Sequence, residues 1–259
     1  MTAGLTPDLA LAARQVRYEQ RAFWRNRPAA FFTFLLPLIF LLVFATLNRD
    51  SLHDGIAFNV FLVPGLLAYG VVMATFTNLA LGLTRARESG ELKRMRGTPI
   101  PSWAFLGGRV VSSVVVAILL AAVTVGLAAA VWNVHVRPEA IPGLLLALAI
   151  GTACLASLGI GMLRVIPNAD AGSVMVNVII LPLTFISGVW GPPDNMPDWL
   201  RRVADFFPLS HLANALRLPF DPRAHGLGIA GADIRALAVW AVAGGFLMVR
   251  ALRAEMRRD

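Results

Sequence analysis

The residues whose types could support chemistry gather in one short segment of this sequence. The segment Arg87–Arg96 holds six charged residues, and Lys93 within it is the only lysine of the chain. Lys93 lies between Leu92 and Arg94 and lacks the Gly-Lys-Ser/Thr setting of a phosphate-binding loop, so it cannot hold ATP in that manner. Clustered charges of both signs without a nucleotide-binding motif favour the docking of a separate protein.

Elsewhere the sequence lacks the residues that catalysis or metal binding would need. The four histidines, His53, His135, His211 and His225, share no metal-ligand spacing, and Cys154 is the single cysteine. An intramembrane hydrolase needs a nucleophile and a base or metal ligands, and an ion-coupled carrier needs ionisable groups within the membrane. We therefore expect no catalytic residue, no metal site and no cofactor in this chain.

The composition is that of a membrane protein. Hydrophobic residues make up 57% of the 259 residues and charged residues 15%, whereas soluble domains carry about 25% charged residues. The net charge of +8 could suggest nucleic acid as a partner, but basic residues also collect at the cytoplasmic surface of membrane proteins. The second explanation fits the apolar composition, so we expect the lipid bilayer and no nucleic acid as a partner.

Six segments are apolar enough to cross a bilayer, which takes about 20 residues. The first five contain no Asp, Glu, Lys, Arg or His in their cores, so any uphill transport would need energy from a separate ATPase. The sixth reaches spanning length if the side chain of Arg235 extends to the lipid headgroups. The predicted fold class is an all-α polytopic membrane protein with one domain over residues 1–259, whose spans are expected at 29–47, 56–83, 104–134, 140–163, 171–190 and 232–250.

The distribution of basic residues predicts the orientation of these spans. Sixteen of the 23 arginine and lysine residues lie in or beside four segments: before the first span, between spans two and three, between spans four and five, and after the sixth. Cytoplasmic loops of membrane proteins carry such an excess of Arg and Lys. We expect a multi-pass protein of a bacterial plasma membrane, with both termini and the loop 84–103 in the cytoplasm.

The first segment, 8–27, is predicted to form a helix that lies in the membrane surface. Arg14, Arg17, Arg21 and Arg25 fall in one narrow arc at about 100° per residue, opposite a mainly apolar face. Arginines on one face of such a helix contact lipid phosphates, so these four are expected to anchor it. A helix end surrounded by water is the alternative.

Small polar residues form a stripe on each of two predicted spans. Thr75 and Asn78 make the weaker stripe on span two. Residues of this kind line either a close helix–helix contact or a polar path, and the helix contact is the commoner arrangement. Both a translocation path and a dimer seam are therefore considered for the two stripes. The second stripe falls within about 100° on span five and consists of Ser173, Asn177, Thr184, Ser187 and Gly188.

The loop between spans five and six, 191–231, is too polar to cross the bilayer but has a helical pattern. Its apolar residues recur at helical spacing after Asp198, and Pro208 ends that pattern. A second helix is expected from Ser210 to Arg217, with Asp198 and Ser210 as the capping residues. A folded cap outside the membrane is one interpretation of this pattern.

The stretch RESGELKRMRGTPIPSW resembles the cytoplasmic loop of ABC-2 type exporter permeases, which commonly reads Arg-Glu-x-Gly-Thr-Leu-x-x-Leu/Met-x-x-Thr-Pro. Similarity also covers RNRP before span one and the stretch after span five that contains SG, MP, WL, FPL and LR. The likeness is nearest to the daunorubicin-resistance and nodulation lipo-oligosaccharide export branches. Glu91 departs from the loop pattern, and the matching residues are Arg87, Glu88, Gly90, Leu92, Met95, Thr98 and Pro99.

This resemblance implies a permease subunit that is not itself an enzyme. Two permease subunits, the second a copy or a paralogue, would pair above two P-loop ATPase subunits that carry the ATP and Mg²⁺. The loop 84–103 would act as a coupling helix through Arg87, Glu88, Gly90, Glu91, Leu92, Lys93, Arg94, Met95, Thr98 and Pro99. The outer region would be re-entrant and form a gate with Pro197, Trp199, Leu200, Phe206, Phe207 and Pro208.

The expected function is export of an amphiphilic substrate, such as a drug or antibiotic, a lipid or a glycolipid, driven by the separate ATPase. The mostly apolar spans favour such a cargo over an inorganic ion, and a role in multidrug or antibiotic resistance fits it. An ATPase-independent channel or carrier is the alternative, and an intramembrane enzyme is opposed by the missing ionisable residues. Of these classes, the exporter is the one that requires loop 84–103 to dock on a partner.

Overall fold

The computed structural model describes residues 5–49, 51–53, 55–96, 102–191 and 196–256. Within these residues, six helical segments are long and apolar enough to cross a membrane, which confirms the all-α, six-span prediction. The described part also contains one short antiparallel hairpin of β1 (Leu52–His53) and β2 (Ile56–Ala57). The six segments are Arg27–Leu47, Phe58–Glu88, Ala104–Trp132, Pro138–Arg164, Ala169–Ile186 and Gly231–Ala254.

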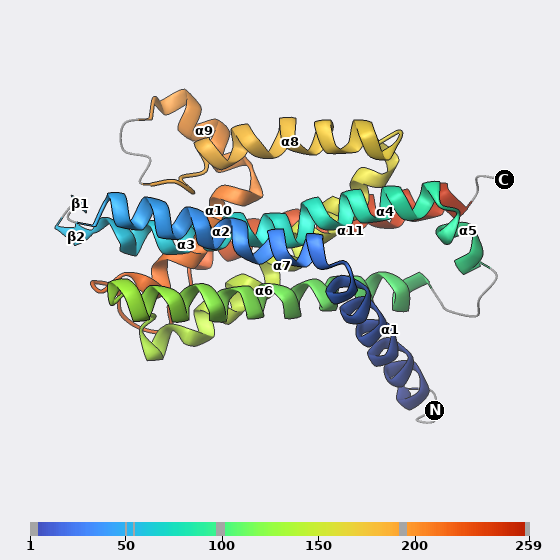
Figure 1. Cartoon of the computed structure of the whole chain (residues 1–259), viewed down its shortest axis with the longest axis horizontal. Helices are drawn as coiled ribbons and strands as arrows, with labels where there is room; N and C mark the ends of the chain where they lie inside the picture. The colour runs from blue at the N-terminus through green and yellow to red at the C-terminus, as the bar shows by residue number, and fades with distance from the viewer. Residues whose placement is uncertain (1–4, 50, 54, 97–101, 192–195, 257–259) are drawn as a thin grey trace.

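The helices run back and forth along the long axis of the molecule (Figure 1). The second span is one continuous rod in which a π-helical turn, η1, joins two α-helices. In chain order the elements are α1 (Leu5–Arg25), α2 (Arg27–Leu47), α3 (Phe58–Val72), η1 (Met73–Thr77), α4 (Asn78–Glu88), α5 (Glu91–Arg96), α6 (Ser102–Trp132), η2 (Pro138–Ala140), α7 (Ile141–Gly161), η3 (Met162–Arg164), α8 (Ala169–Ile186), α9 (Asp198–Phe206), α10 (Pro208–Arg217), η4 (Leu218–Phe220) and α11 (Gly231–Met256).

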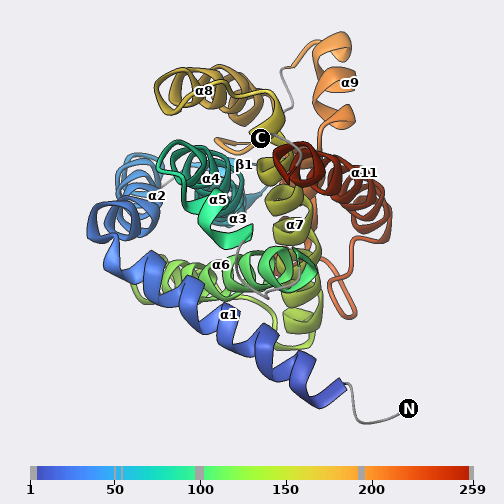
Figure 2. The same cartoon turned by 90° about the vertical axis from the view of Figure 1, so that its right-hand side faces the viewer.

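The second and fourth spans form the centre of the bundle. Of their most apolar stretches 78% and 67% are buried, against 33% or less in the other four spans. Figure 2 views the helices end-on and shows α3, α4 and α7 with α2, α6, α8 and α11 around them. Large apolar side chains on the outer helices are exposed, for example Phe32, Val178 and Val242. Such surfaces suit lipid tails or another membrane subunit.

Small residues let the central helices approach other segments closely. A Cβ atom on Gly65 of α3 would collide with the carbonyl oxygen of Val189, just beyond α8. A Cβ atom on Gly159 of α7 would lie 2.7 Å from the carbonyl oxygen of Phe76 in the π-helical turn. At both positions the backbones are so close that glycine is required.

The two ends of the bundle carry different elements. The connection of α1 to the bundle, α5, the turn between α7 and α8, and the end of α11 lie at one end, and the β1–β2 hairpin lies at the other (Figure 1). The sequence analysis assigns these two ends to the cytoplasm and to the outside, respectively. α1 itself leaves the bundle at a steep angle and crosses beneath α6 (Figure 2).

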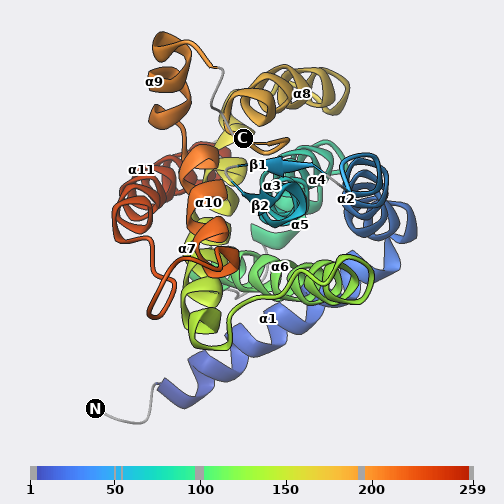
Figure 3. The same cartoon turned by 90° about the vertical axis from the view of Figure 1, so that its left-hand side faces the viewer.

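The outer region folds into two short helices that enter the bundle. α9 ends beside the middle of α11, where Nε1 of Trp240 donates to the carbonyl oxygen of Phe206 at 3.0 Å. α10 then packs among α3, α7 and α11 (Figure 3). At its end, Arg217 donates to the carbonyl oxygen of Gly188, just past the outer end of α8. Between α9 and the end of α10 the polypeptide chain therefore turns into the bundle and out again.

The predicted capping residues of these two helices are wrong. Pro197 rather than Asp198 is the N-cap of α9, and Phe207 rather than Ser210 is the N-cap of α10. Proline is favoured at the first position of a helix, where its missing N–H has no helical partner to lose. Pro208 therefore starts α10, and Ser210 falls inside the first turn.

Candidate functional site

The predicted coupling segment begins where α4 ends. Gly90 adopts a φ of +71°, a left-handed conformation that favours glycine, and its N–H donates to the carbonyl oxygen of Arg87 at 3.1 Å. The chain turns there and starts α5. Leu92 of α5 is buried in an apolar cluster that includes Leu83 of α4 and Leu163 of η3. α5 is therefore seated on the bundle by an apolar side chain of its own.

The charged residues of α5 have different surroundings. Lys93 and Arg94 are exposed, and Nη2 of Arg94 donates to the carbonyl oxygen of Ser89 at 3.3 Å. Glu91 lines a cavity between α5 and α1. Within α5, Leu92 thus holds the helix in place, and Lys93 and Arg94 form an exposed basic pair. The side chain of Met95 and the whole of Thr98 and Pro99 lie outside the described residues.

Arg87 on α4 binds the turn that joins α7 to α8. Its guanidinium donates to the carbonyl oxygens of Leu163 at 2.8 Å, Ile166 at 2.6 Å and Pro167 at 2.8 Å. These carbonyls lie at and just after the end of a helical segment, where backbone acceptors lack helical partners. Hydrogen bonds from a charged donor are about twice as strong as neutral ones, so the contact holds the turn firmly.

Glu88 binds the other side of the same turn. Its Oε1 accepts a hydrogen bond at 2.8 Å from the N–H of Ala169, the first residue of α8. Asn168 caps this helix by accepting from the N–H of Ala171 at 2.8 Å. A carboxylate at a helix N-terminus also interacts favourably with the helix dipole. Two adjacent residues of opposite charge therefore hold the end of η3 and the start of α8.

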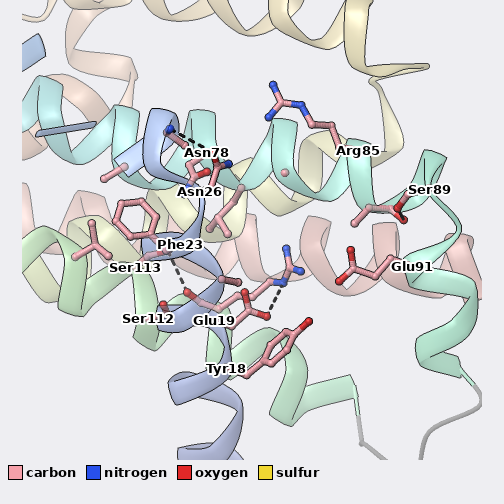
Figure 4. Close-up of a pocket in the computed structure, with 18 residues that line it drawn as sticks. Tyr18, Glu19, Phe23, Asn26, Asn78, Arg85, Ser89, Glu91, Ser112 and Ser113 are labelled. Atoms are coloured by element: carbon pink, nitrogen blue, oxygen red, sulfur yellow. Dashed lines mark hydrogen bonds and ion pairs between the residues drawn. The ribbon is translucent and has the colours of Figure 1, made fainter. Parts of the chain in front are cut away.

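A cavity of about 380 Å³ lies between α1, α4, α5 and α6 (Figure 4). Asn78 and Glu91 line it, and Glu19 of α1 forms an ion pair there with Arg109 of α6 at 3.1 Å. Burial raises the pKa of Glu19 above its ordinary value; the charge of Arg109 and a hydrogen bond from Gln15 oppose the rise, and Glu91 adds to it. The cavity thus holds a carboxylate whose charge depends on its arginine partner.

α1 is attached to the bundle through polar contacts. Nε2 of Gln20 donates to the carbonyl oxygen and to Oγ of Ser112 on α6, at 2.8 Å and 2.9 Å. Gly108 of α6 allows this approach, because a Cβ atom there would collide with Gln15. The arginines expected to contact lipid phosphates lie on exposed positions of the helix and are Arg14, Arg17, Arg21 and Arg25.

The residues of the two predicted polar stripes do not lie on one surface. Thr75 is buried and donates to the carbonyl oxygen of Val71 at 2.6 Å, within its own span. Asn78 lines the cavity of Figure 4. On span five the first two residues are exposed and the other three are buried: Ser173 and Asn177, and Thr184, Ser187 and Gly188.

A second cavity, of about 360 Å³, has mainly apolar walls from the second span, α7, α8 and α11. Leu158 and Leu183 are among its lining residues, and Trp240 lines it at the level where α9 meets α10. Arg164 and Arg250 line the same cavity and belong to the end of the bundle that carries α5. The space thus combines an apolar body with two basic side chains at one end.

The expected outer gate is held to its neighbours by polar contacts. Nδ1 of His211 on α10 lies 2.8 Å from Oδ1 of Asp233 on α11. Within α10, Nη1 of Arg217 donates to Oδ1 of Asn214 at 2.9 Å. Within the described residues, no group of three or more His, Cys, Asp or Glu could hold a metal ion. Of the expected gate residues, Pro197, Trp199 and Phe206 are exposed, Leu200 and Phe207 are half-buried, and Pro208 is buried.

Sequence reasoning missed several of these contacts. Two of these contacts join different helices, so no local sequence pattern predicts them: Glu19 with Arg109, and His211 with Asp233. The cap of α8 did have a signal. Asn168 followed by an acidic residue in the first turn is the usual pattern of a helix start.

The chain matches the family model of the ABC-2 type transporter over residues 10–220. It is 26% identical over 168 residues to the probable multidrug ABC transporter permease YbhR of Escherichia coli, which covers 64% of this chain and 45% of that protein. It is 28% identical over 188 residues to the daunorubicin resistance ABC transporter permease protein DrrB1 of Streptomyces coeruleorubidus, with 71% of this chain and 65% of that protein covered.

A third relative is nodulation protein J of Rhizobium leguminosarum bv. viciae. The identity is 26% over 165 residues, which make up 63% of each chain. The matched region spans about half of YbhR and somewhat less than two thirds of the other two proteins.

Proposed function

Because the chain belongs to the ABC-2 type transporter family, we propose that it is the membrane permease subunit of an ATP-driven exporter. In this proposal, a separate P-loop ATPase binds ATP and Mg²⁺ and docks on α5. The chain itself supplies the membrane path and no catalytic residue. It lies in a bacterial plasma membrane with α5 and both termini on the cytoplasmic side, and α1 rests in the headgroup layer through its exposed arginines.

The construction of α5 is the observation that carries this proposal. Leu92 anchors the helix in an apolar cluster, the turn at Gly90 sets its direction, and Lys93 and Arg94 are exposed. A basic segment that served only to keep a loop in the cytoplasm would need the charges but not the buried anchor. A charged helix that is fixed to the transmembrane bundle is suited to receive a push from a docked protein.

A second permease subunit, a copy or a paralogue, is proposed to pack against α8, with two ATPase subunits below the pair. Ser173 and Asn177 are exposed on this helix between large exposed apolar residues such as Val174 and Val178. The hydroxyl of Ser173 donates to the carbonyl oxygen of Asp170 at 2.8 Å within its own helix, whereas an amide such as that of Asn177 facing lipid tails needs partners that a neighbouring helix can supply. This part of the stripe therefore supports a dimer seam.

The proposed cargo is an amphiphile. The apolar cavity beside α8 and α11 suits a lipid-like or drug-like body, and Arg164 and Arg250 could contact a polar head at the cytoplasmic end. The names of the relatives YbhR, a probable multidrug permease, and DrrB1, a daunorubicin resistance permease, agree with a cargo of this kind. The helices α9 and α10 are proposed to form the gate on the outer side.

The test is co-purification of the chain with its P-loop ATPase from membranes. Lys93→Glu combined with Arg94→Glu is expected to abolish recovery of the ATPase, because the charges of two exposed residues of α5 are reversed. Arg49→Glu combined with Arg202→Glu makes the same change in charge at exposed positions of the outer end and should leave recovery unchanged. Thermal unfolding in detergent should be the same for both double variants.

ATP hydrolysis provides the second readout of this test. The purified chain should hydrolyse no ATP, and the activity should appear only in preparations that contain the partner. Full recovery of the ATPase by the Lys93→Glu, Arg94→Glu variant would contradict docking on α5. Turnover by the chain alone would contradict its assignment as the non-catalytic subunit.

A further inference from the structure

Two neighbouring residues of α4 bind both sides of the turn before α8. The guanidinium of Arg87 contacts carbonyl oxygens at and after the end of η3, and the carboxylate of Glu88 contacts the first N–H of α8. The C-terminal end of a helix carries a partial negative charge and the N-terminal end a partial positive charge. The order of the two charges on α4 thus matches the order of the two helix ends on the turn.

An apolar layer lies beneath these hydrogen bonds. Leu92 of α5 and Leu163 of η3 belong to the same buried cluster. Ile166 of the turn is buried and lies close to Gly172 of α8. A Cβ atom on Gly172 would be 2.9 Å from Cγ2 of Ile166. The same Cβ atom would be 3.2 Å from a methyl carbon of Leu81 on α4. α4 therefore contacts α5, η3 and α8, and links them to one another.

α8 as a whole is less buried than the central spans. In the described chain 22% of the most apolar stretch of this span is buried, against 78% for the second span. Pro182 interrupts the backbone hydrogen bonds of α8 in its last third. A displacement of the first turn of α8 would thus meet little resistance from neighbouring helices of the same chain.

We propose that Arg87 and Glu88 are the positioning residues that transmit movement of α5 to α8. This inference rests on the proposed function, in which an ATPase docks on α5. When the ATPase moves α5, the rigid α4 end and the turn move with it, and the hydrogen bonds carry the start of α8 along. The fifth span is then the element of this subunit that responds first to the ATPase.

A purely structural role would be different. If Arg87 and Glu88 only kept the turn in shape, their loss would loosen the turn equally with and without nucleotide. A transmitting role predicts that their loss removes the nucleotide-dependent part of the change. The relevant measurement is therefore the difference in backbone hydrogen exchange between two nucleotide states, and not the exchange of one state.

The experiment uses the full chain in complex with its P-loop ATPase, either without nucleotide or trapped with ATP and orthovanadate. Hydrogen exchange is measured over residues 88–96 and 163–176. In the unmodified complex we expect trapping to change exchange in both segments. In Arg87→Gln and in Glu88→Ala, the change in 88–96 should persist and the change in 163–176 should be lost.

Arg85→Gln is the matched control, because Arg85 is on the same helix two residues earlier and lines the cavity of Figure 4 on a different side of α4. This variant should keep the change in both segments. Glu88 is exposed, so Glu88→Ala tests the inference even if Arg87→Gln does not fold.

The outcomes separate the two proposals. If the ATPase binds and both Arg87→Gln and Glu88→Ala keep the nucleotide-dependent change in 163–176, the transmitting role is wrong and the proposed function stands. If the unmodified chain recovers no ATPase, the proposed function is wrong and this inference falls with it.

Discussion

At the scale of single residues, substitutions are expected to change stability most at two kinds of position. These are charged residues that line a cavity and glycines whose backbone contacts another backbone segment. Glu19 and Arg109 illustrate the first kind, because they join α1 to α6 inside a cavity and are only 12% and 11% exposed. Gly65 illustrates the second kind, because the backbone of Val189 occupies the space that a side chain would need. Both sites lend themselves to paired variants.

Arg109→Gln should destabilise the protein by about 1–3 kcal/mol at neutral pH, because the carboxylate of Glu19 would be left buried without its cation. Adding Glu19→Gln should restore most of the loss, since no ionised group then remains unpaired. Thermal unfolding in detergent measures both effects. Equal destabilisation by the single and the double variant would contradict this account of the pair.

The pH dependence of the same pair has a defined sign. The pKa of Glu19 is raised in the folded protein, so the folded state holds its proton to a higher pH than the unfolded state does. Stability should therefore fall as the pH rises from the ordinary carboxylate range through the raised pKa. The fall in stability should be larger in Arg109→Gln, because this variant removes the positive charge that opposes the rise in pKa. In Glu19→Gln the side chain no longer titrates, so this site should contribute no pH dependence.

Gly65→Ala should lower stability by about 1–3 kcal/mol, because the added methyl group overlaps backbone atoms that cannot move independently. Gly126→Ala on α6 is the control, since a Cβ atom there meets no other atom within 4 Å. Replacing glycine within a helix by alanine at such a site should raise stability by about 0.5–1 kcal/mol. Shifts of the same sign in the unfolding temperature would contradict the packing described for α3.

At the scale of elements, α5 is a short helix that depends on its neighbours. Isolated helices of fewer than about 12 residues are marginal in water, so α5 needs contacts with the bundle to persist. Leu92 supplies the buried contact, and Gly90 permits the turn that brings it there. α9 and α10 depend in the same way on α11, through the contacts of Trp240 with Phe206 and of Asp233 with His211.

Leu92→Ala should destabilise the end of the bundle that carries α5 by about 2–5 kcal/mol, the usual range for removing a buried leucine side chain. Lys93→Ala, one residue later and exposed, should change the free energy of unfolding by less than about 0.5 kcal/mol. Proteolysis or hydrogen exchange at residues 84–96 would report the loosening. If the two variants behaved alike, the seating of α5 by Leu92 would be wrong.

The sequence predicts the elements better than it predicts their contacts. The apolar runs act locally, so the six spans could be anticipated. The turn at Gly90 that separates α4 from α5 was not anticipated from the sequence. The bond of Arg87 to Leu163 joins residues 76 positions apart, and only the packing of the spans brings them together. The predicted cap of α10 was wrong because Pro208 takes the first helical position, where proline is favoured, and the N-cap of α9 is Pro197 in place of Asp198.

The polar stripe on span five shows the same limit. Helical spacing predicts a common face, but Ser173 and Asn177 are exposed while Thr184 is buried. Pro182 lies between them, and a proline within a helix changes the direction of its axis. The side of α8 that becomes buried before and after Pro182 depends on its contacts with α4, α9 and α10. The sequence of α8 alone does not specify these contacts.

At the scale of the whole molecule, one end of the bundle is basic and carries α5, the start of α8 and the end of α11, whereas the other carries the hairpin, α9 and α10 (Figure 1). Asp, Glu, Lys, Arg and His are confined to the ends of the first five spans. The central claim is therefore that energy enters this protein mechanically, at the basic end, from a protein in the compartment that holds ATP.

Site-directed labelling of α5 with a membrane-impermeant maleimide tests that claim most directly. Cys154 is the only cysteine in the sequence and is buried, so single variants report on the introduced thiol. Lys93→Cys should be labelled in inverted membrane vesicles and protected in right-side-out vesicles, and Arg202→Cys on α9 should show the reverse. Labelling of Lys93→Cys in right-side-out vesicles would place α5 outside the cell and contradict the account.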